Sequence, residues 1–284
     1  MIRIIQSNKI TRSIYYAYVI LFLIYLLAPL FITAILAFNN NPTPSFPWRG
    51  FTLKWFSSKT AGSEGVFGEK RMTEAIATSM KVASCVTLPA VLLGITNAFL
   101  FERQSFKGKQ FLYLLMLVPL VIPGVVLGIS ILSFAYRIAN IIDKMFGRGV
   151  GSFLRPGFWL VVFGQLSFSA TLTTLVISSR LRRFDLALEE AAMDLGASRV
   201  EAVLLVTFRF LAPAILSAAI ISFLFSFNNF NTTYFLIGTE PTLPVLLYSR
   251  LRFGITPQIN AVSVFLIAVA GLLGLSSILT GYSK

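Results

Sequence analysis

The chain has 284 residues, of which 56% are hydrophobic and only 12% charged, and its net charge is +13. Soluble domains carry about 25% charged residues, so this composition excludes a soluble domain and indicates a membrane protein. The absence of histidine and the presence of a single cysteine, Cys85, exclude His-based acid–base catalysis, Cys/His zinc sites and an intrachain disulfide.

Six charge-free stretches divide the chain, and each holds enough apolar residues to cross about 30 Å of hydrocarbon. The basic residues are scattered among the short segments between them and form no single stripe, so we expect a lipid bilayer and no nucleic acid as a partner. The sequence therefore predicts an all-α membrane protein with six transmembrane helices. In chain order the stretches are Ile14–Trp48, Val82–Phe101, Gln110–Tyr136, Pro156–Ser179, Phe210–Thr239 and Phe253–Ser283.

The segment from Asn39 to Thr73 separates the first expected span from the others. It carries Pro, Gly and Ser together with several aromatic residues, which is typical of an extracytoplasmic loop that rests its rings at the membrane interface. We therefore divide the chain into residues 1–72, a transmembrane helix with an extracytoplasmic loop, and residues 73–284, which hold the other five spans.

Proline residues lie within or near several spans, where they remove helix hydrogen bonds, so we expect kinked helices. Such kinks can line a transport pathway, but kinked packing without any role is about as common. The prolines are Pro29, Pro89, Pro119, Pro123 and Pro213.

Six spans place both termini on one side of the membrane. With the N-terminus in the cytoplasm, twelve Lys and Arg lie on the cytoplasmic side and eleven on the other, and Lys81 lies near the start of the second span. The cytoplasmic segments are shorter, so their density of positive charge is higher, and long translocated loops have little weight. We expect both termini in the cytoplasm.

The segment between the fourth and fifth spans predicts two short helices joined at a glycine. Asp185 can cap a helix whose first turns carry Glu189 and Glu190, and Gly196 then ends it. Ser198 and Glu201 have the spacing of a capping box, which begins a second helix that runs into the fifth span.

The first of these helices has the features of a docking surface. Ala191 and Ala192 are small side chains that allow another surface to approach the backbone, and the neighbouring acidic groups could meet a basic partner. An alanine-rich helix that ends at a glycine is also commonplace, so the residues alone leave both interpretations open.

At these residues the sequence resembles the EAA loop of ABC importer permeases, in which Glu-Ala-Ala, three residues and Gly form a coupling helix. Glu190, Ala191, Ala192 and Gly196 match that spacing, and the loop, residues 180–210, falls between the corresponding spans. The resemblance implies a MetI-like permease fold in which these four residues and Asp194 fit a groove of a separate ATP-binding subunit.

Several later segments are similar to the spermidine/putrescine branch of these permeases. Two departures are Arg209, where the family usually has proline, and the pair Asn228 and Asn229, where the branch has two aspartates. The matching segments are Ser226–Phe230, Thr242–Pro244, Tyr248–Arg250 and Arg252–Ala261.

The amides in the fifth span bear on the solute. A buried aspartate pair would attract a cation, whereas two asparagines offer donors and acceptors without net charge, so a neutral, zwitterionic or hydroxylated solute fits at least as well as a polyamine. Our hypothesis is that Asn228, Asn229 and Asn231 contact the pathway. The alternative is that they bond neighbouring helices.

No phosphate-binding Gly-x-x-x-x-Gly-Lys-Ser/Thr signature occurs, and the expected spans contain no Asp or Glu for ion coupling. We therefore expect a transport subunit with no catalytic residue, metal site or cofactor, in which ATP and Mg²⁺ are bound by a partner ATPase. The resemblance implies an importer of the bacterial inner membrane whose partners are an ABC ATPase dimer, a second and related permease, and a periplasmic binding protein. The alternative, a membrane-embedded scaffold or enzyme, needs a polar catalytic cluster or a large soluble docking domain, and neither is visible in the sequence.

Overall fold

The computed structural model describes residues 9–57, 65–252, 254 and 256–282, so Phe253 and Ile255 of the Arg252–Ala261 segment lie outside the described residues. The chain divides into two compact units, residues 1–70 with 253–269 and residues 71–252 with 270–284. Across the described residues the regular elements are helices, and β-structure is limited to one isolated bridge between Asn39 and Phe51. The predicted all-α class is confirmed, while the division at residue 72 stays a prediction.

The first unit contains α1 (Lys9–Ala37), α2 (Lys54–Ser57) and the start of α12 (Pro257–Tyr282). The first expected span therefore ends at Ala37 rather than Trp48. Asn39 explains the change, because its amide donates to the carbonyl of Ser45 at 3.1 Å and accepts from the N–H of Arg49 at 2.8 Å. The loop that follows α1 is thus held by a buried side chain and not by helix hydrogen bonds.

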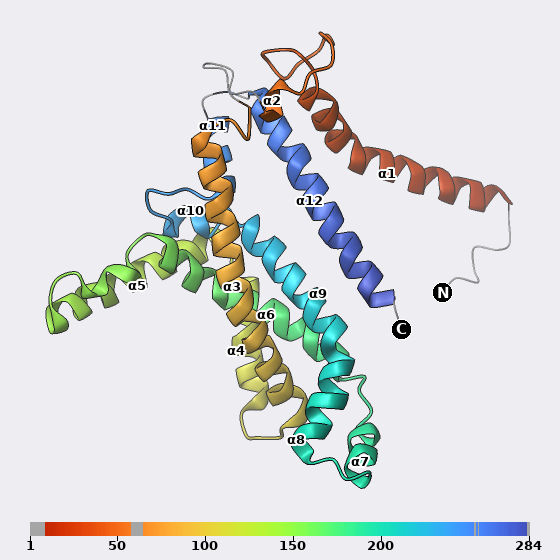
Figure 1. The fold of residues 1–284 in the computed structure, drawn as a ribbon, viewed down its shortest axis with the longest axis vertical. Coiled ribbons are helices and arrows are strands. Elements are labelled where there is room, and N and C mark those ends of the chain that lie inside the picture. The colour runs from red at the N-terminus through yellow and green to blue at the C-terminus, as the bar shows by residue number, and fades with distance from the viewer. Residues whose placement is uncertain (1–8, 58–64, 253, 255, 283–284) are drawn as a thin grey trace. The chain divides into compact units, whose positions relative to one another are not determined.

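The second unit holds the remaining helices (Figure 1). Its long elements are α3 (Lys70–Arg103), α4 (Lys109–Val121), α5 (Gly124–Phe146), α6 (Phe158–Leu181) and α9 (Phe208–Phe227). The shorter ones are η2 (Val150–Leu154), α7 (Ala187–Asp194), α8 (Arg199–Ala202), the π-helical turn η3 (Val203–Thr207), α10 (Thr233–Leu236) and α11 (Leu243–Leu251).

Five helices of the described chain are long and apolar enough to cross a membrane. They are Thr11–Ala37, Lys70–Arg103, Gly124–Phe146, Phe158–Leu181 and Arg199–Phe227, and two shorter apolar helices cover Lys109–Val121 and Pro257–Val269.

Two expected spans have different boundaries in the structure. The span predicted at Gln110–Tyr136 is split into α4 and α5 at Pro123, which has no N–H to continue the helix and adopts an extended conformation. The span predicted at Phe210–Thr239 ends at Phe227, and a non-helical segment follows it. The other prolines, Pro29, Pro89, Pro119 and Pro213, lie inside helices.

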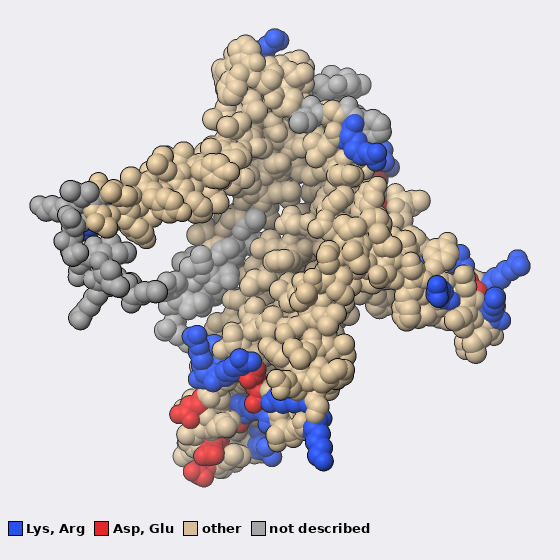
Figure 2. Space-filling model, turned by 180° about the vertical axis from the view of Figure 1, so that it is seen from behind, with Lys and Arg blue, Asp and Glu red and all other residues tan. Residues whose placement is uncertain are grey.

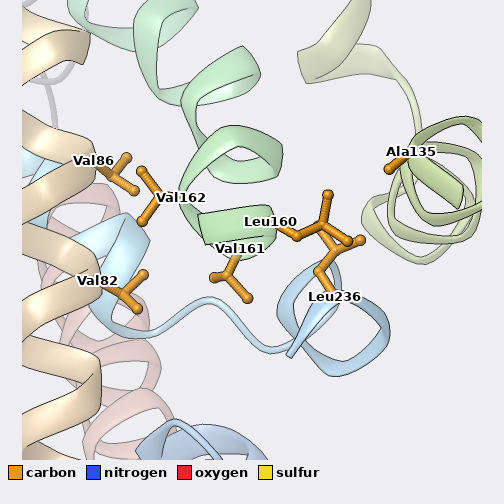
Figure 3. Close-up of a cluster of buried hydrophobic side chains, with 7 residues drawn as sticks. All are labelled: Val82, Val86, Ala135, Leu160, Val161, Val162 and Leu236. Carbon is orange, nitrogen blue, oxygen red and sulfur yellow. The ribbon is translucent and has the colours of Figure 1, made fainter. Parts of the chain in front are cut away.

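The most buried helix of the second unit is α6, which packs on α9, α4 and α10. Figure 3 shows one part of this core, where side chains of α6 meet α3, α5 and α10. Close to it, Gly94 of α3 lets the helices approach, because a Cβ there would lie 2.5 Å from the hydroxyl of Thr173. That hydroxyl donates to the carbonyl of Ala90 at 2.6 Å, which joins α3 to α6 at this point. The cluster in Figure 3 contains Val82, Val86, Ala135, Leu160, Val161, Val162 and Leu236.

Candidate functional site

The helix α7 begins and ends as the sequence predicts. The Asp185 carboxylate accepts the N–H of Ala187 at 3.0 Å, which satisfies a free donor at the start of the helix. At the other end Gly196 has a φ of +96°, a conformation that side chains with a Cβ rarely adopt. The N–H of Gly196 donates to the carbonyl of Met193 at 2.9 Å and that of Ala197 to the carbonyl of Ala192 at 3.1 Å, which is a Schellman termination.

The predicted capping box of the next helix is also confirmed. The Ser198 hydroxyl accepts the N–H of Glu201, and the Glu201 carboxylate accepts the N–H of Ser198 at 2.8 Å. The chain then continues through α8, η3 and α9. Arg209, the departure from the usual proline, is an exposed residue of α9 directly after the π-helical turn.

Most of the predicted docking residues lie on the surface at this end of the second unit. Glu190, Ala191, Asp194 and Gly196 are exposed, and Ala192 is half-buried. Figure 2 shows acidic and basic side chains gathered at the end of the unit where α7 and α8 lie. Charge and small side chains are thus accessible on this surface, as the predicted docking role requires.

The surface between α7 and α8 is also apolar. Leu195, next to Gly196, is 90% exposed, and Val200 is 67% exposed. Exposed apolar side chains rimmed by charge are characteristic of a protein–protein contact.

Glu189 fastens α7 to neighbouring helices, and the sequence did not indicate this contact. The Glu189 carboxylate accepts a hydrogen bond from Nη1 of Arg103, at the end of α3, at 2.7 Å, and another from the Thr207 hydroxyl at the end of η3. We name Arg103, Glu189 and Thr207 the clasp. The Arg103 guanidinium holds the pKa of Glu189 below its ordinary value. Because the two charged residues are 86 positions apart, no sequence spacing could indicate the pair.

Aromatic rings and a second ion pair surround the clasp. The Arg103 guanidinium lies 5.4 Å from the ring centroid of Phe99 and 5.3 Å from that of Phe184. Beside it, Arg182 donates to Glu102 at 2.9 Å. The loop that carries α7 is therefore tied to the end of α3 at two points.

The candidate pathway amides lie where α9 ends. Asn229 accepts the N–H groups of Thr232 and Thr233 at 3.3 and 3.2 Å and the Thr233 hydroxyl at 3.1 Å, so it holds the start of α10. Asn228 is exposed, and its amide donates to the carbonyl of Leu224 at 3.1 Å. Asn231 is exposed beside the start of α5. For Asn229 the contacts favour the alternative, in which the amide bonds neighbouring chain segments.

A buried glutamine supports the non-helical segment that separates α9 from α10, and it was not among the residues predicted to be important. Gln165 of α6 is fully buried; its amide donates to the Thr233 hydroxyl at 2.7 Å, and its oxygen accepts from the Ser226 hydroxyl. Together with Asn229 these side chains form a hydrogen-bonded chain that links α9, α6 and α10. Gln165 lies in a charge-free stretch of the sequence. Its polar side chain within that stretch was the one sequence feature that could have indicated a structural role.

The docking residues and the amides are not brought together. They lie beyond opposite ends of the 29-residue helical run Arg199–Phe227, which is about 43 Å long at 1.5 Å per residue. The predicted docking residues and the candidate amides therefore form no common site.

Comparisons with known proteins agree on one class. The family model described as "Binding-protein-dependent transport system inner membrane component" matches residues 90–282. The putrescine transport system permease protein PotI of Escherichia coli K12 is 30% identical over 252 residues, which cover 88% of this chain and 84% of the relative. The spermidine/putrescine permease protein PotC of the same organism is 26% identical over 261 residues, 92% of this chain and 90% of the relative.

Solved structures share the fold. A bacterial ABC transporter involved in the import of the acidic polysaccharide alginate matches with a TM-score of 0.76 at 18% identity, over 99% of this chain and 98% of the other. The methionine transporter MetNI matches with a TM-score of 0.52 at 14% identity, over 72% and 90%.

Proposed function

The chain belongs to the family of binding-protein-dependent transport system inner membrane components and is a permease subunit of an ABC importer, and we propose that α7 is the part on which its ATPase acts. It is a multi-pass inner-membrane protein and not an enzyme. We propose that it carries a small polar solute, which a periplasmic binding protein delivers.

The observation that carries this proposal is the form of α7. Its exposed Glu190 and Ala191 lie on a helix that is capped at both ends and fastened to α3. A rigid, small-residue surface of this kind can receive a force and pass it to the spans. That is what an importer subunit without an ATP site of its own requires.

The proposed assembly follows the resemblance of the sequence. An ABC ATPase dimer binds the coupling residues Glu190, Ala191, Ala192, Asp194 and Gly196 and holds ATP and Mg²⁺, so this chain needs no cofactor. A second, related permease encloses the pathway with it. Both termini lie in the cytoplasm, which places α7 on the ATPase side. One fold neighbour was solved in complex with a periplasmic protein, which supports delivery by a binding protein.

The proposed solute is a polyamine or a related polar or zwitterionic compound. Support for this class comes from the names of the two relatives, a putrescine and a spermidine/putrescine permease. Asn228 and Asn229 replace the aspartates of the polyamine branch, and two neutral amides suit a zwitterionic solute at least as well as a cation. Exposed Asn228 and Asn231 are the proposed contacts, and Asn229 shapes the segment that presents them.

Two glycines allow a matched test of the docking role. Gly196 and Gly108 both have positive φ and open space around the position of a Cβ, so Gly196→Asp and Gly108→Asp introduce the same strain and charge at different loops. With the ATPase co-expressed, Gly196→Asp should reduce the amount that co-purifies at least about tenfold, a loss of about 1.4 kcal/mol. Gly108→Asp should leave it unchanged. Equal retention by both variants contradicts the docking role of α7.

A further inference from the structure

The clasp joins three elements through one carboxylate. Glu189 belongs to α7, Arg103 ends α3, and Thr207 ends η3, directly before α9. The neighbouring Glu190 is exposed, whereas the Glu189 side chain is only 12% exposed. Adjacent helix positions point about 100° apart, so one glutamate faces outward while the other faces the protein.

The burial of the clasp makes it hard to open. The Arg103 side chain is 18% exposed and lies near two aromatic rings, so neither charge of the pair would be well solvated alone. Loss of one partner leaves the other charge poorly compensated, which costs more than an exposed pair contributes. The clasp should therefore keep α7, α3 and η3 together when α7 is displaced.

The third residue of the clasp lies at the end of a π-helical turn. Thr207 is fully buried and is the last residue of η3, and π-helical turns inside α-helices occur frequently at functional sites. Glu189 is bonded to α3 through Arg103 and to the start of α9 through Thr207, so a displacement of Glu189 acts on both helices. At the far end of α9 lie the exposed Asn228 and Asn231.

We propose that Glu189, held by Arg103 and Thr207, is the positioning residue that transmits the displacement of α7 to α3 and α9. The proposal rests on the proposed function of α7 but concerns different residues. Glu190 and its neighbours bind the ATPase, and the clasp converts that contact into movement of the spans.

The nearby pair of Arg182 and Glu102 provides the control. It also joins the loop to the end of α3, and its Glu102 side chain is 15% exposed, but its Arg182 side chain is 58% exposed. Loss of Glu102 therefore leaves an arginine that water can solvate, and ion pairs with an exposed partner contribute little. Glu102→Gln therefore removes a charge at the same place without opening the clasp.

The test measures movement rather than transport, so it needs no identified solute. In a Cys85→Ser background, a cysteine introduced by Asn231→Cys reports its labelling rate by a membrane-impermeant maleimide, in the complete transporter with its ATPase. Addition of ATP, Mg²⁺ and vanadate should change this rate in the parent protein. Glu189→Gln should reduce that change at least about fivefold while the ATPase still co-purifies and hydrolyses ATP. Glu102→Gln should behave as the parent.

Two further variants separate positioning from folding. Thr207→Val keeps the ion pair and should reduce the response without loss of the ATPase. Arg103→Glu combined with Glu189→Arg should restore part of the response that either single change removes. A parent-like response in Glu189→Gln overturns the proposal, as does loss of the ATPase in Thr207→Val, since Glu189 and Thr207 would then serve docking itself. A parent protein that does not respond to ATP contradicts the proposed function instead.

Discussion

The adjacent residues Glu189 and Glu190 have the same side chain and different surroundings, since Glu190 is exposed and Glu189 is bonded to Arg103. Both could be predicted to lie in the first turn of a capped helix, because Asp185 and Gly196 mark its ends. Which of them faces the protein depends on Arg103, which lies 86 positions away in the chain. The sequence therefore predicted the helix and its caps correctly and missed the glutamate that fastens it.

The clasp predicts a defined pH dependence. The ordinary pKa of Glu189 is 4.5, and the bond from Arg103 lowers it in the folded protein. The stabilisation from this carboxylate is therefore present above pH 4.5 and is lost as the pH falls through the lowered pKa. At pH 7, Glu189→Gln should have a lower unfolding temperature than the parent, and the difference should close as the pH falls below 4.5 and through the lowered pKa. Unfolding in detergent from pH 7 to 3 measures it; a difference that stays constant with pH contradicts the assignment.

At the scale of the helices, the sequence predicted that prolines would disturb the spans, but not that one of them would divide a span into two helices. Pro123 lies inside a predicted span, and the structure breaks that span there into α4 and α5. The end of α9 was missed, because it depends on Gln165, Ser226 and Thr233, which come from different helices and are assembled only by packing. Apolar composition fixes where a span can lie, and buried polar contacts decide where its helix stops.

Gln165 should be important for the stability of this break. Gln165→Leu removes the acceptor of the buried Ser226 hydroxyl and the donor to the Thr233 hydroxyl, which keeps its bond to Asn229. This loss should destabilise the protein by about 1–3 kcal/mol. Thr96→Val is the control, because its hydroxyl is exposed and bonds only its own helix, and it should cost less than about 0.5 kcal/mol. Thermal unfolding of the purified variants measures both. Equal unfolding temperatures for the two variants would show that the polar chain does not hold the break.

At the scale of the whole chain, a low fraction of charged residues indicated a membrane protein, and family membership confirms it. The charges of α7 and α8 gather at one end of the second unit (Figures 1 and 2). The amides follow the other end of α9, where Asn228 is the C-cap. This separation agrees with the proposed roles, in which the ATPase binds at α7 and the solute is contacted at the other end of α9. The identity of the partner subunits was not open to prediction from composition, because they are other chains.

The most direct measurement is a cysteine cross-link between α7 and the ATPase. In the Cys85→Ser background, Ala191→Cys exposes a thiol on α7, and Asn231→Cys exposes one beyond the far end of α9. With a short bifunctional maleimide in the assembled transporter, the account predicts a cross-link to the ATPase from position 191 and none from position 231. A cross-link from position 231 with none from position 191 would contradict it.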